Sequence, residues 1–268
     1  MDFLQAIILG VIQGITEWLP VSSKGNVSAI AQLMGLPVRD AFSFAVLLHI
    51  GTLVAAAVYF RKEIIALLKI KDKKLTKFIA IALVCTGITA LPSYLLLRTI
   101  LEKESIILFG LTVHTQTIFM MLLGIFLIIT GLLQRRKKTF DEKNYSGKNA
   151  AILGLGQGLT VMPGMSRSGT TVAILLFEKF SPEEAFKISF LLSVPAVLLG
   201  ELSFGILEGP QLSTGLFYGI IAAAIAGFIS IHALLKLAEK INFSKFCIAL
   251  GILYLAIAAI AVALPFIA

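Results

Sequence analysis

Charged residues are scarce in this sequence. Asp, Glu, Lys and Arg make up 14% of its 268 residues, whereas 58% are hydrophobic and the mean hydropathy is +0.96. An ordinary soluble domain carries roughly 25% charged residues, so this composition excludes a soluble globular protein. A helix needs about 20 apolar residues to cross a bilayer, and the length leaves room for about six or seven crossings in a single membrane domain.

Cysteine and histidine are rare as well. Cys85 and Cys247 both lie inside apolar runs, where a thiol usually acts as a small hydrophobic side chain, so we expect neither a disulfide nor a cysteine metal site. His49, His114 and His232 do not share a spacing typical of metal ligands. Each is expected to be a hydrogen-bonded helix residue. Among the three, His49, inside an apolar run, is the strongest candidate for a further role.

Acidic residues are fewer than basic ones, 15 against 23, which gives a formal net charge of +8. The basic residues gather in three short clusters between apolar runs, at 61–77, 134–149 and 236–245. Such clusters are typical of cytoplasmic loops under the positive-inside rule. The charge therefore indicates membrane orientation, and we expect no nucleic-acid partner.

Six apolar runs are each long enough to cross a bilayer. They lie at about 42–60, 77–97, 113–133, 183–206, 213–235 and 246–267. With the three basic clusters inside, every run has one inside and one outside end. We expect an all-α, multi-pass protein of the plasma membrane, in which Glu201, toward one end of its run, snorkels to the interface.

Two further apolar regions, 3–35 and 150–178, are interrupted by Pro, Gly and Ser, so neither can form one continuous helix. The orientation places both ends of each region on one face, which predicts two re-entrant helical hairpins. Segment 10–16 (GVIQGIT) resembles segment 154–160 (GLGQGLT) at an offset of 144 (154 minus 10). Because each copy precedes three crossings, residues 1–134 and 149–268 are predicted to form an inverted-topology repeat.

The two interrupted regions should meet inside the protein, because irregular backbone at membrane depth needs a protein or water-filled surrounding. The second region offers Ser166, Arg167 and Ser168 at the start of a helix. Backbone N–H groups, a planar guanidinium and a helix N-terminus together suit phosphate. The alternative is that the hydroxyls cap the helix and Arg167 pairs with an acid, although an arginine at this depth is usually functional.

In the first region, Gln13 and Glu17 are four residues apart and share one helix face, with Ser23 just past the interruption. A carboxylate there can hold Mg²⁺ or Ca²⁺ against a diphosphate, or act as a general base. Ser23 is a candidate nucleophile. Two simpler interpretations stay open: Glu17 neutralises Arg167 or Lys24, and Ser23 caps a helix.

Both regions resemble the motifs of one known family. Segment 13–17 (QGITE) matches (E/Q)xxxE, and segment 163–171 (PGMSRSGTT) matches PGxSRSxxT at every specified position. These are the two signatures of the undecaprenyl diphosphate phosphatases associated with bacitracin resistance. The resemblance spans both halves of the chain. It implies a multi-pass hydrolase that converts a polyprenyl diphosphate to the monophosphate, usually with a divalent cation, at a site open to the outer face.

The resemblance also implies roles for individual residues. Glu17, Ser23 and Arg167 would be catalytic, and Glu17 would also be the metal ligand. Substrate binding would involve polar residues of both interruptions: Gln13, Lys24, Asn26, Ser166, Ser168 and Thr171. Asn26 stands where the family pattern has a histidine, and an asparagine cannot take up a proton, so a mechanism with that base is excluded. The natural lipid is left open among polyprenyl and dolichyl diphosphates.

Secondary transporters also build a midplane site from inverted repeats with interrupted helices. The alternative function is therefore a transporter or flippase for a phosphorylated polyprenyl lipid. Glu17 and Ser23 beside the phosphate site favour hydrolysis, because an anion carrier gains little from them. The expected partners are the polyprenyl diphosphate and the bilayer, and a homodimer is left open.

Overall fold

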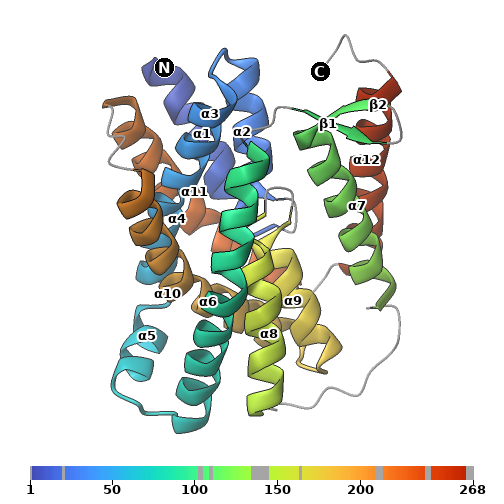
Figure 1. The fold of residues 1–268 in the computed structure, drawn as a ribbon. Coiled ribbons are helices and arrows are strands. Elements are labelled where there is room, and N and C mark those ends of the chain that lie inside the picture. The colour runs from blue at the N-terminus through green and yellow to red at the C-terminus, as the bar shows by residue number, and fades with distance from the viewer. Residues whose placement is uncertain are drawn as a thin grey trace.

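The computed structural model describes residues 2–19, 22–101, 105–108, 111–133, 145–162, 165–208, 214–238 and 243–263. Helices dominate these residues, as Figure 1 shows. The composition explains this, because lipid cannot hydrogen-bond to backbone N–H and C=O groups, and a helix pairs these groups within one segment.

The elements follow one another in two series. The first is α1 (Phe3–Thr16), α2 (Ser23–Leu33), α3 (Val38–Leu47), α4 (His49–Tyr59), α5 (Arg61–Leu68), α6 (Lys73–Leu101), β1 (Ser105–Leu108), β2 (Leu111–His114) and α7 (Thr115–Leu133). The second is α8 (Gly147–Leu159), α9 (Arg167–Phe177), α10 (Pro182–Glu208), α11 (Thr214–Ala238) and α12 (Phe243–Ala263).

Four stretches of the described chain are long and apolar enough to cross a membrane: Asp40–Tyr59, Lys73–Leu97, Pro182–Ser203 and Thr214–Ala233. They coincide with four of the predicted crossings and confirm a multi-pass, mainly helical membrane protein. The predicted crossings at 113–133 and 246–267 fall on α7 and α12. The total of six crossings stays a prediction.

One short β-hairpin stands among the helices of this mainly α-helical chain. Strands β1 and β2 form an antiparallel hairpin in which Ile106 pairs with Val113 and Ile107 pairs with Thr112. These residues are β-branched, which favours a strand over a helix. The predicted crossing at 113–133 therefore begins inside β2, and its helix starts only at Thr115.

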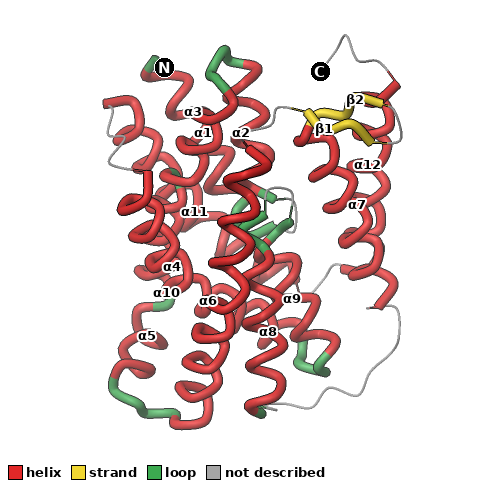
Figure 2. Tube along the Cα trace, viewed as in Figure 1, coloured by secondary structure: helices red, strands yellow, loops and turns green. Residues whose placement is uncertain are grey.

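Each of the two apolar regions contains two helices in place of one, which confirms the predicted interruptions. Helices α1 and α2 form one helix–turn–helix unit, and α8 and α9 form a second. The two units enter from opposite ends of the bundle, and their turns lie near its middle (Figures 1 and 2). Residues 20, 21, 163 and 164, which include the predicted helix-breaking prolines, lie outside the described residues. That the units are re-entrant in a bilayer stays a prediction.

Each unit packs one helix closely against a long helix of the other half. A Cβ atom at Gly10 of α1 would strike the carbonyl oxygen of Gly219 and the Cβ of Ala222 on α11. A Cβ atom at Gly154 of α8 would strike the carbonyl oxygen of Ala82 and the Cβ of Cys85 on α6. Only glycine permits these approaches.

The correspondence continues one turn further along both pairs. Gly14 lies against Ala226 and Gly227 of α11, and Gly158 lies against Thr89 and Ala90 of α6. Gly158 of α8 follows Gly14 of α1 by 144 positions (158 minus 14). Ala226 of α11 follows Thr89 of α6 by 137 positions (226 minus 89), and both differences hold for the contacts one turn earlier. The α1–α11 and α8–α6 interfaces therefore have the same register.

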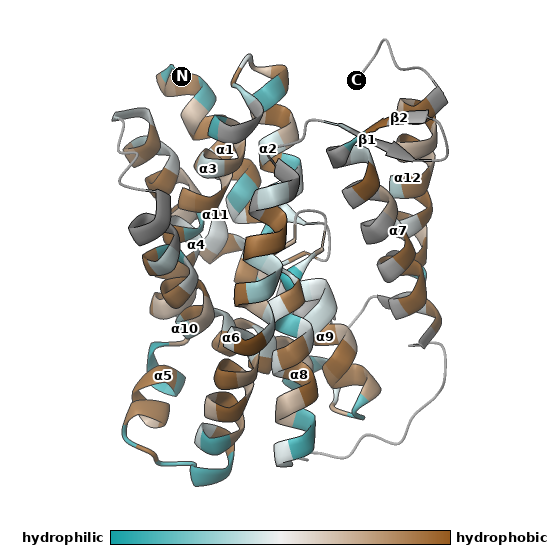
Figure 3. Cartoon of the chain, in the orientation of Figure 1, coloured by the Kyte–Doolittle hydropathy of each residue, from teal (hydrophilic) through white to brown (hydrophobic). Residues whose placement is uncertain are grey.

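The described basic residues of the three clusters gather at one end of the bundle. Figure 3 shows hydrophilic residues at the lower ends of α5, α6 and α8, and apolar residues along the helices above them. Lys148 lies in the first turn of α8, and Lys245 lies in the first turn of α12. Under the positive-inside rule, basic residues gather on one face of a membrane protein, and this distribution agrees with that rule.

Candidate active site

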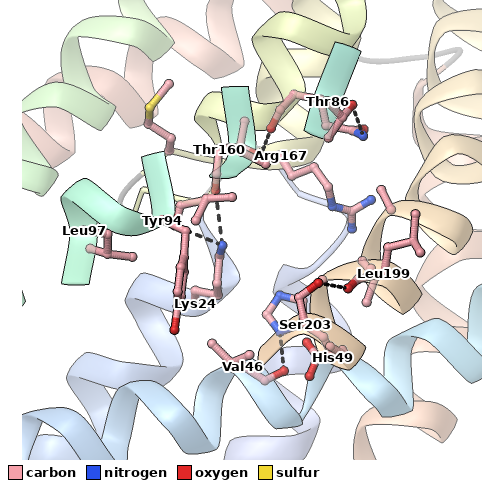
Figure 4. Close-up of a pocket in the computed structure, with 18 of the residues that line it drawn as sticks. Lys24, Val46, His49, Thr86, Tyr94, Leu97, Thr160, Arg167, Leu199 and Ser203 are labelled. Carbon is pink, nitrogen blue, oxygen red and sulfur yellow. Dashed lines mark hydrogen bonds between the residues drawn. The ribbon is translucent and has the colours of Figure 1, made fainter. Parts of the chain in front are cut away.

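The two turns face a cavity of about 330 Å³ between α6 and α10, shown in Figure 4. We call residues 17–19 and 22–23 the first tip, and residues 160–162 and 165–167 the second tip. Polar side chains from both tips line one side of the cavity, and apolar side chains of α6 and α10 line the other. The structure thus brings together residues that lie about 140 positions apart in the sequence.

Glu17 is the centre of the polar side. Its side chain is 3% exposed and lies one residue past the end of α1. Its Oε2 accepts hydrogen bonds from Nε2 of Gln13 at 2.8 Å and from Oγ of Ser23 at 2.6 Å. The predicted face shared by Gln13 and Glu17 is therefore present, and Ser23 points at the carboxylate.

Two basic side chains also contact this carboxylate. Arg167 donates from Nη2 to Oε1 of Glu17. His49 places Nε2 3.1 Å from Oε2, while its Nδ1 lies 2.9 Å from the carbonyl oxygen of Ala45. A ring with hydrogen on both nitrogens satisfies both acceptors. Glu17 thus lies between two basic side chains.

Large side chains and backbone groups fix the first tip. Trp18 is buried, packs edge-on against Phe190 with ring centroids 5.0 Å apart, and donates from Nε1 to the carbonyl oxygen of Gly227 at 3.1 Å. The carbonyl oxygen of Leu19 accepts a hydrogen bond from Oγ of Ser168 at 2.8 Å. The neighbouring Glu17 therefore sits on an anchored segment.

A basic side chain in or next to each tip contacts the helix end at the other tip. Lys24 donates from Nζ to the carbonyl oxygen of Thr160, at the C-terminal end of α8, at 3.1 Å (Figure 4). Arg167 binds Glu17, at the C-terminal end of α1. Cations are stabilised at helix C-termini, so these crossed contacts hold the tips together.

Ser23 begins α2 behind a strained residue. Ser22 has φ of 56° and ψ of 79°, in the left-handed region that few residues other than glycine adopt. Its buried Oγ has no hydrogen-bond partner in the described structure. Such strain is concentrated at functional sites. Here it orients the first turn of α2 toward the cavity, with Ser23 at its start.

Arg167 keeps one donor free for a ligand. Its Nη1 is buried and has no partner among the described residues, while Nη2 is bound to Glu17. A buried guanidinium donor beside a cavity is suited to an incoming phosphate oxygen. The alternative raised by the sequence, that Arg167 pairs with an acid, is thus also present in the structure, and the two roles coexist in one side chain.

The other predicted substrate-binding residues make contacts within the protein. Ser166 caps α9 and lines the cavity, whereas the described cavity wall does not include Ser168 or Thr171. Thr171 lies 2.6 Å from Oγ of the buried Ser189. Asn26 lies 3.2 Å from the hydroxyl of Tyr254 on α12 and is likewise not on that wall. Their roles in substrate binding stay predictions.

Sequence reasoning missed two residues of the cavity. His49 was expected to be a hydrogen-bonded helix residue, which it is, but it also contacts Glu17. Glu201 was expected to snorkel, yet it lines the cavity, and its Oε2 is buried without a partner in the described structure. A histidine and a glutamate inside apolar runs were the available signals, because ionisable residues at membrane depth are costly.

The divalent-cation prediction depends on the oxygen atoms around the cavity. The described residues contain no group of three His, Cys, Asp or Glu side chains that could hold a metal ion. On the cavity wall, one amide oxygen and one carboxylate oxygen are buried without a partner among the described residues, namely Oε1 of Gln157 and Oε2 of Glu201. Mg²⁺ and Ca²⁺ prefer carboxylate and amide oxygens, so the donor set fits such an ion in type.

The described chain is thus a bundle of apolar membrane helices with a serine–carboxylate pair and basic side chains in its interior. The sequence matches the model of the family described as "Bacitracin resistance protein BacA" over residues 6–253. The chain belongs to this family.

Curated relatives agree over nearly their whole length. An undecaprenyl-diphosphatase of Methanothrix thermoacetophila is 38% identical over 266 residues, covering 97% of this chain and 98% of that protein. Undecaprenyl-diphosphatases of Methanococcoides burtonii and Sulfurisphaera tokodaii are 35% and 34% identical, covering 94% and 90% of this chain and 97% and 92% of theirs. The predicted family is therefore confirmed.

Proposed function

We propose that this protein hydrolyses an undecaprenyl-type diphosphate to the monophosphate and inorganic phosphate, and so recycles a lipid carrier. The family and the names of the relatives support this activity. The observation that carries it is the Ser23–Glu17 pair, which lies with the free donor of Arg167 on the wall of a cavity that continues into apolar side chains. The polar side suits a diphosphate head, and the apolar side suits an isoprenoid chain.

The first chemical step is attack on the terminal phosphorus. Glu17 takes the proton of Ser23 across their 2.6 Å hydrogen bond, and Oγ forms a bond to the phosphorus. The bond from that phosphorus to the bridging oxygen breaks, and the leaving lipid monophosphate takes the proton from Glu17. Arg167 binds the charge on the transferred phosphoryl oxygens through Nη1.

The second step releases inorganic phosphate. Glu17 takes a proton from a water molecule, and the water oxygen attacks the phosphorus of the phosphoserine. As the bond between that phosphorus and Oγ of Ser23 breaks, Glu17 returns the proton to Oγ. His49 and Arg167 hold the carboxylate in place between the two steps. Asn26 takes no part in proton transfer, and Glu17 supplies that function.

A divalent cation is part of the proposal. Glu17, Glu201 and the free amide oxygen of Gln157 would hold it on the cavity wall. When bound, such an ion neutralises diphosphate charge and polarises the phosphorus–oxygen bond. The contribution of the chain is to offer these oxygens opposite Arg167.

The inverted repeat and the orientation also belong to this proposal. The equal registers of the α1–α11 and α8–α6 interfaces support a repeat of residues 1–134 and 149–268. The antiparallel α7–α12 pair adds support, because its close approaches are reciprocal. A Cβ atom at Gly124 would strike Gly251 and Leu255, and one at Gly251 would strike Gly124 and Ile128. Basic residues at one end support a cytoplasmic face there and a site open to the outer face of the plasma membrane.

Phosphate release distinguishes a hydrolase from the alternative transporter or flippase. Purified protein in detergent is incubated with undecaprenyl diphosphate and Mg²⁺ or Ca²⁺, with and without a chelator. We expect release in the presence of metal, and a loss of about 10²-fold or more in a Ser23→Ala variant. Binding of the lipid without phosphate release under any of these conditions would refute hydrolysis and favour a carrier.

A further inference from the structure

The apolar side of the cavity reaches the outer surface of the bundle. Leu91 of α6 and Leu199 of α10 line the cavity, yet they are 60% and 56% exposed. Gly87 and Gly200 also line it, and a Cβ atom at either position would meet nothing within 4 Å. The cavity is therefore open sideways between α6 and α10, where lipid surrounds a membrane protein.

The corresponding helix pair on the other side of the molecule is closed. In the repeat, α4 and α11 correspond to α10 and α6. A Cβ atom at Gly51 of α4 would lie 2.8 Å from the Cβ of Ala223 on α11, and one at Gly227 would lie 3.2 Å from the Cβ of Ala55. Small residues thus allow α4 and α11 to touch along their length.

The sequence explains why only one pair closes. Segment 41–60 (AFSFAVLLHIGTLVAAAVYF) aligns with segment 185–204 (AFKISFLLSVPAVLLGELSF) at the same offset of 144 (185 minus 41). In this alignment Gly51 corresponds to Pro195, and Ala55 corresponds to Leu199. The larger side chains keep α10 from approaching α6 as α4 approaches α11.

Prolines add to the difference between the two pairs. Pro92 lies inside α6 and Pro195 lies inside α10, whereas the sequences of α4 and α11 contain no proline. A proline inside a helix removes one backbone hydrogen bond and crowds the preceding turn, which bends the helix. Both helices beside the opening therefore carry a feature that works against close parallel packing.

The size of the cavity decides what must occupy this opening. Its volume of about 330 Å³ is at the lower end of the range for drug-sized ligands. It can accept a diphosphate and the adjoining isoprene units, but it cannot enclose a long polyprenyl chain. The remainder of the chain must leave the protein, and an apolar chain leaves most favourably into lipid.

We propose that the isoprenoid chain of the substrate passes through the opening between α6 and α10, and that Gly87 and Gly200 border this opening. This inference rests on the proposed function. It assigns the two glycines to substrate entry: they keep the passage clear, since a side chain at either position would project into it. The wall residues Leu91 and Leu199 contact the chain as it leaves the cavity.

The test compares Gly87→Phe and Gly200→Phe with Ile88→Phe and Leu198→Phe. The control residues are 61% and 48% exposed on the same helices and are absent from the described cavity wall. We expect the glycine variants to raise KM for undecaprenyl diphosphate about tenfold or more with kcat little changed, because they remove binding that is shared by the ground and transition states. Farnesyl diphosphate, with a short chain, should be affected much less.

A second measurement uses the unmodified protein and does not depend on the folding of any variant. Unmodified protein is irradiated with a polyprenyl diphosphate that carries a photoreactive group on its chain, and the labelled peptides are identified by mass spectrometry. Labels on α6 and α10 are expected. Labels confined to α4 and α11, or glycine variants that match their controls with the long substrate, would overturn the passage. Failure of the unmodified protein to hydrolyse either lipid would instead refute the proposed function.

Discussion

Replacing Glu17 with glutamine tests the centre of the site. The amide keeps the size of the side chain and can still accept hydrogen bonds at its oxygen, but it carries no charge and cannot take a proton from Ser23. Loss of a positioned base typically lowers kcat by about 10²-fold to 10⁴-fold. We therefore expect the kcat of the Glu17→Gln variant to be at least about 10²-fold lower than that of the unmodified protein at saturating metal and lipid.

The same substitution should also weaken the fold. Arg167 and His49 would lose the carboxylate that both contact inside the bundle. Breaking a buried ion pair by removing one partner costs about 3–5 kcal/mol. A double variant, Glu17→Gln with His49→Gln, removes one of the two basic side chains left without a counter-charge and should recover part of this stability, whereas turnover should stay low.

The assay follows phosphate release and thermal unfolding in the same detergent, with Glu183→Gln as the control. Glu183 is exposed in the first turn of α10, away from the cavity wall. The control should match the unmodified protein in both measurements. If the double variant recovered turnover together with stability, Glu17 would be a structural ion-pair partner and the general-base argument would be refuted.

Three further predictions concern the cations and the topology. Arg167→Lys should lower kcat by about 10²-fold, because lysine keeps the charge but cannot bind Glu17 and phosphate with separate nitrogens; phosphate release at saturating lipid measures this. His49→Gln should retain more activity than His49→Leu, by about tenfold, because glutamine can still donate to Glu17, and equal rates would contradict a positioning role. In a background without native cysteines, Thr214→Cys should react with an impermeant thiol reagent from outside, and Asp72→Cys only after permeabilisation; the reverse pattern would overturn the proposed orientation.

The sequence alone indicated the membrane, the interruptions and most of the polar site. Apolar runs predict membrane helices because the bilayer has a fixed thickness, and a cluster of Pro, Gly and Ser residues marks an interruption between helices. The charge clusters and the repeated GxxQGxT pattern are local features that can be read directly. They indicated two facing turns with Glu17, Ser23 and Arg167 before any contact was known.

Only the tertiary structure decided which distant residues complete the site and where it opens. His49 joins Glu17 because α4 packs beside the first tip, and no spacing in the sequence predicts that approach. Glu201 reaches the cavity because α10 stands away from α6. Helix packing depends on how side chains on two surfaces fit together, so the closed α4–α11 pair and the open α6–α10 pair become distinguishable only when all four helices are in place.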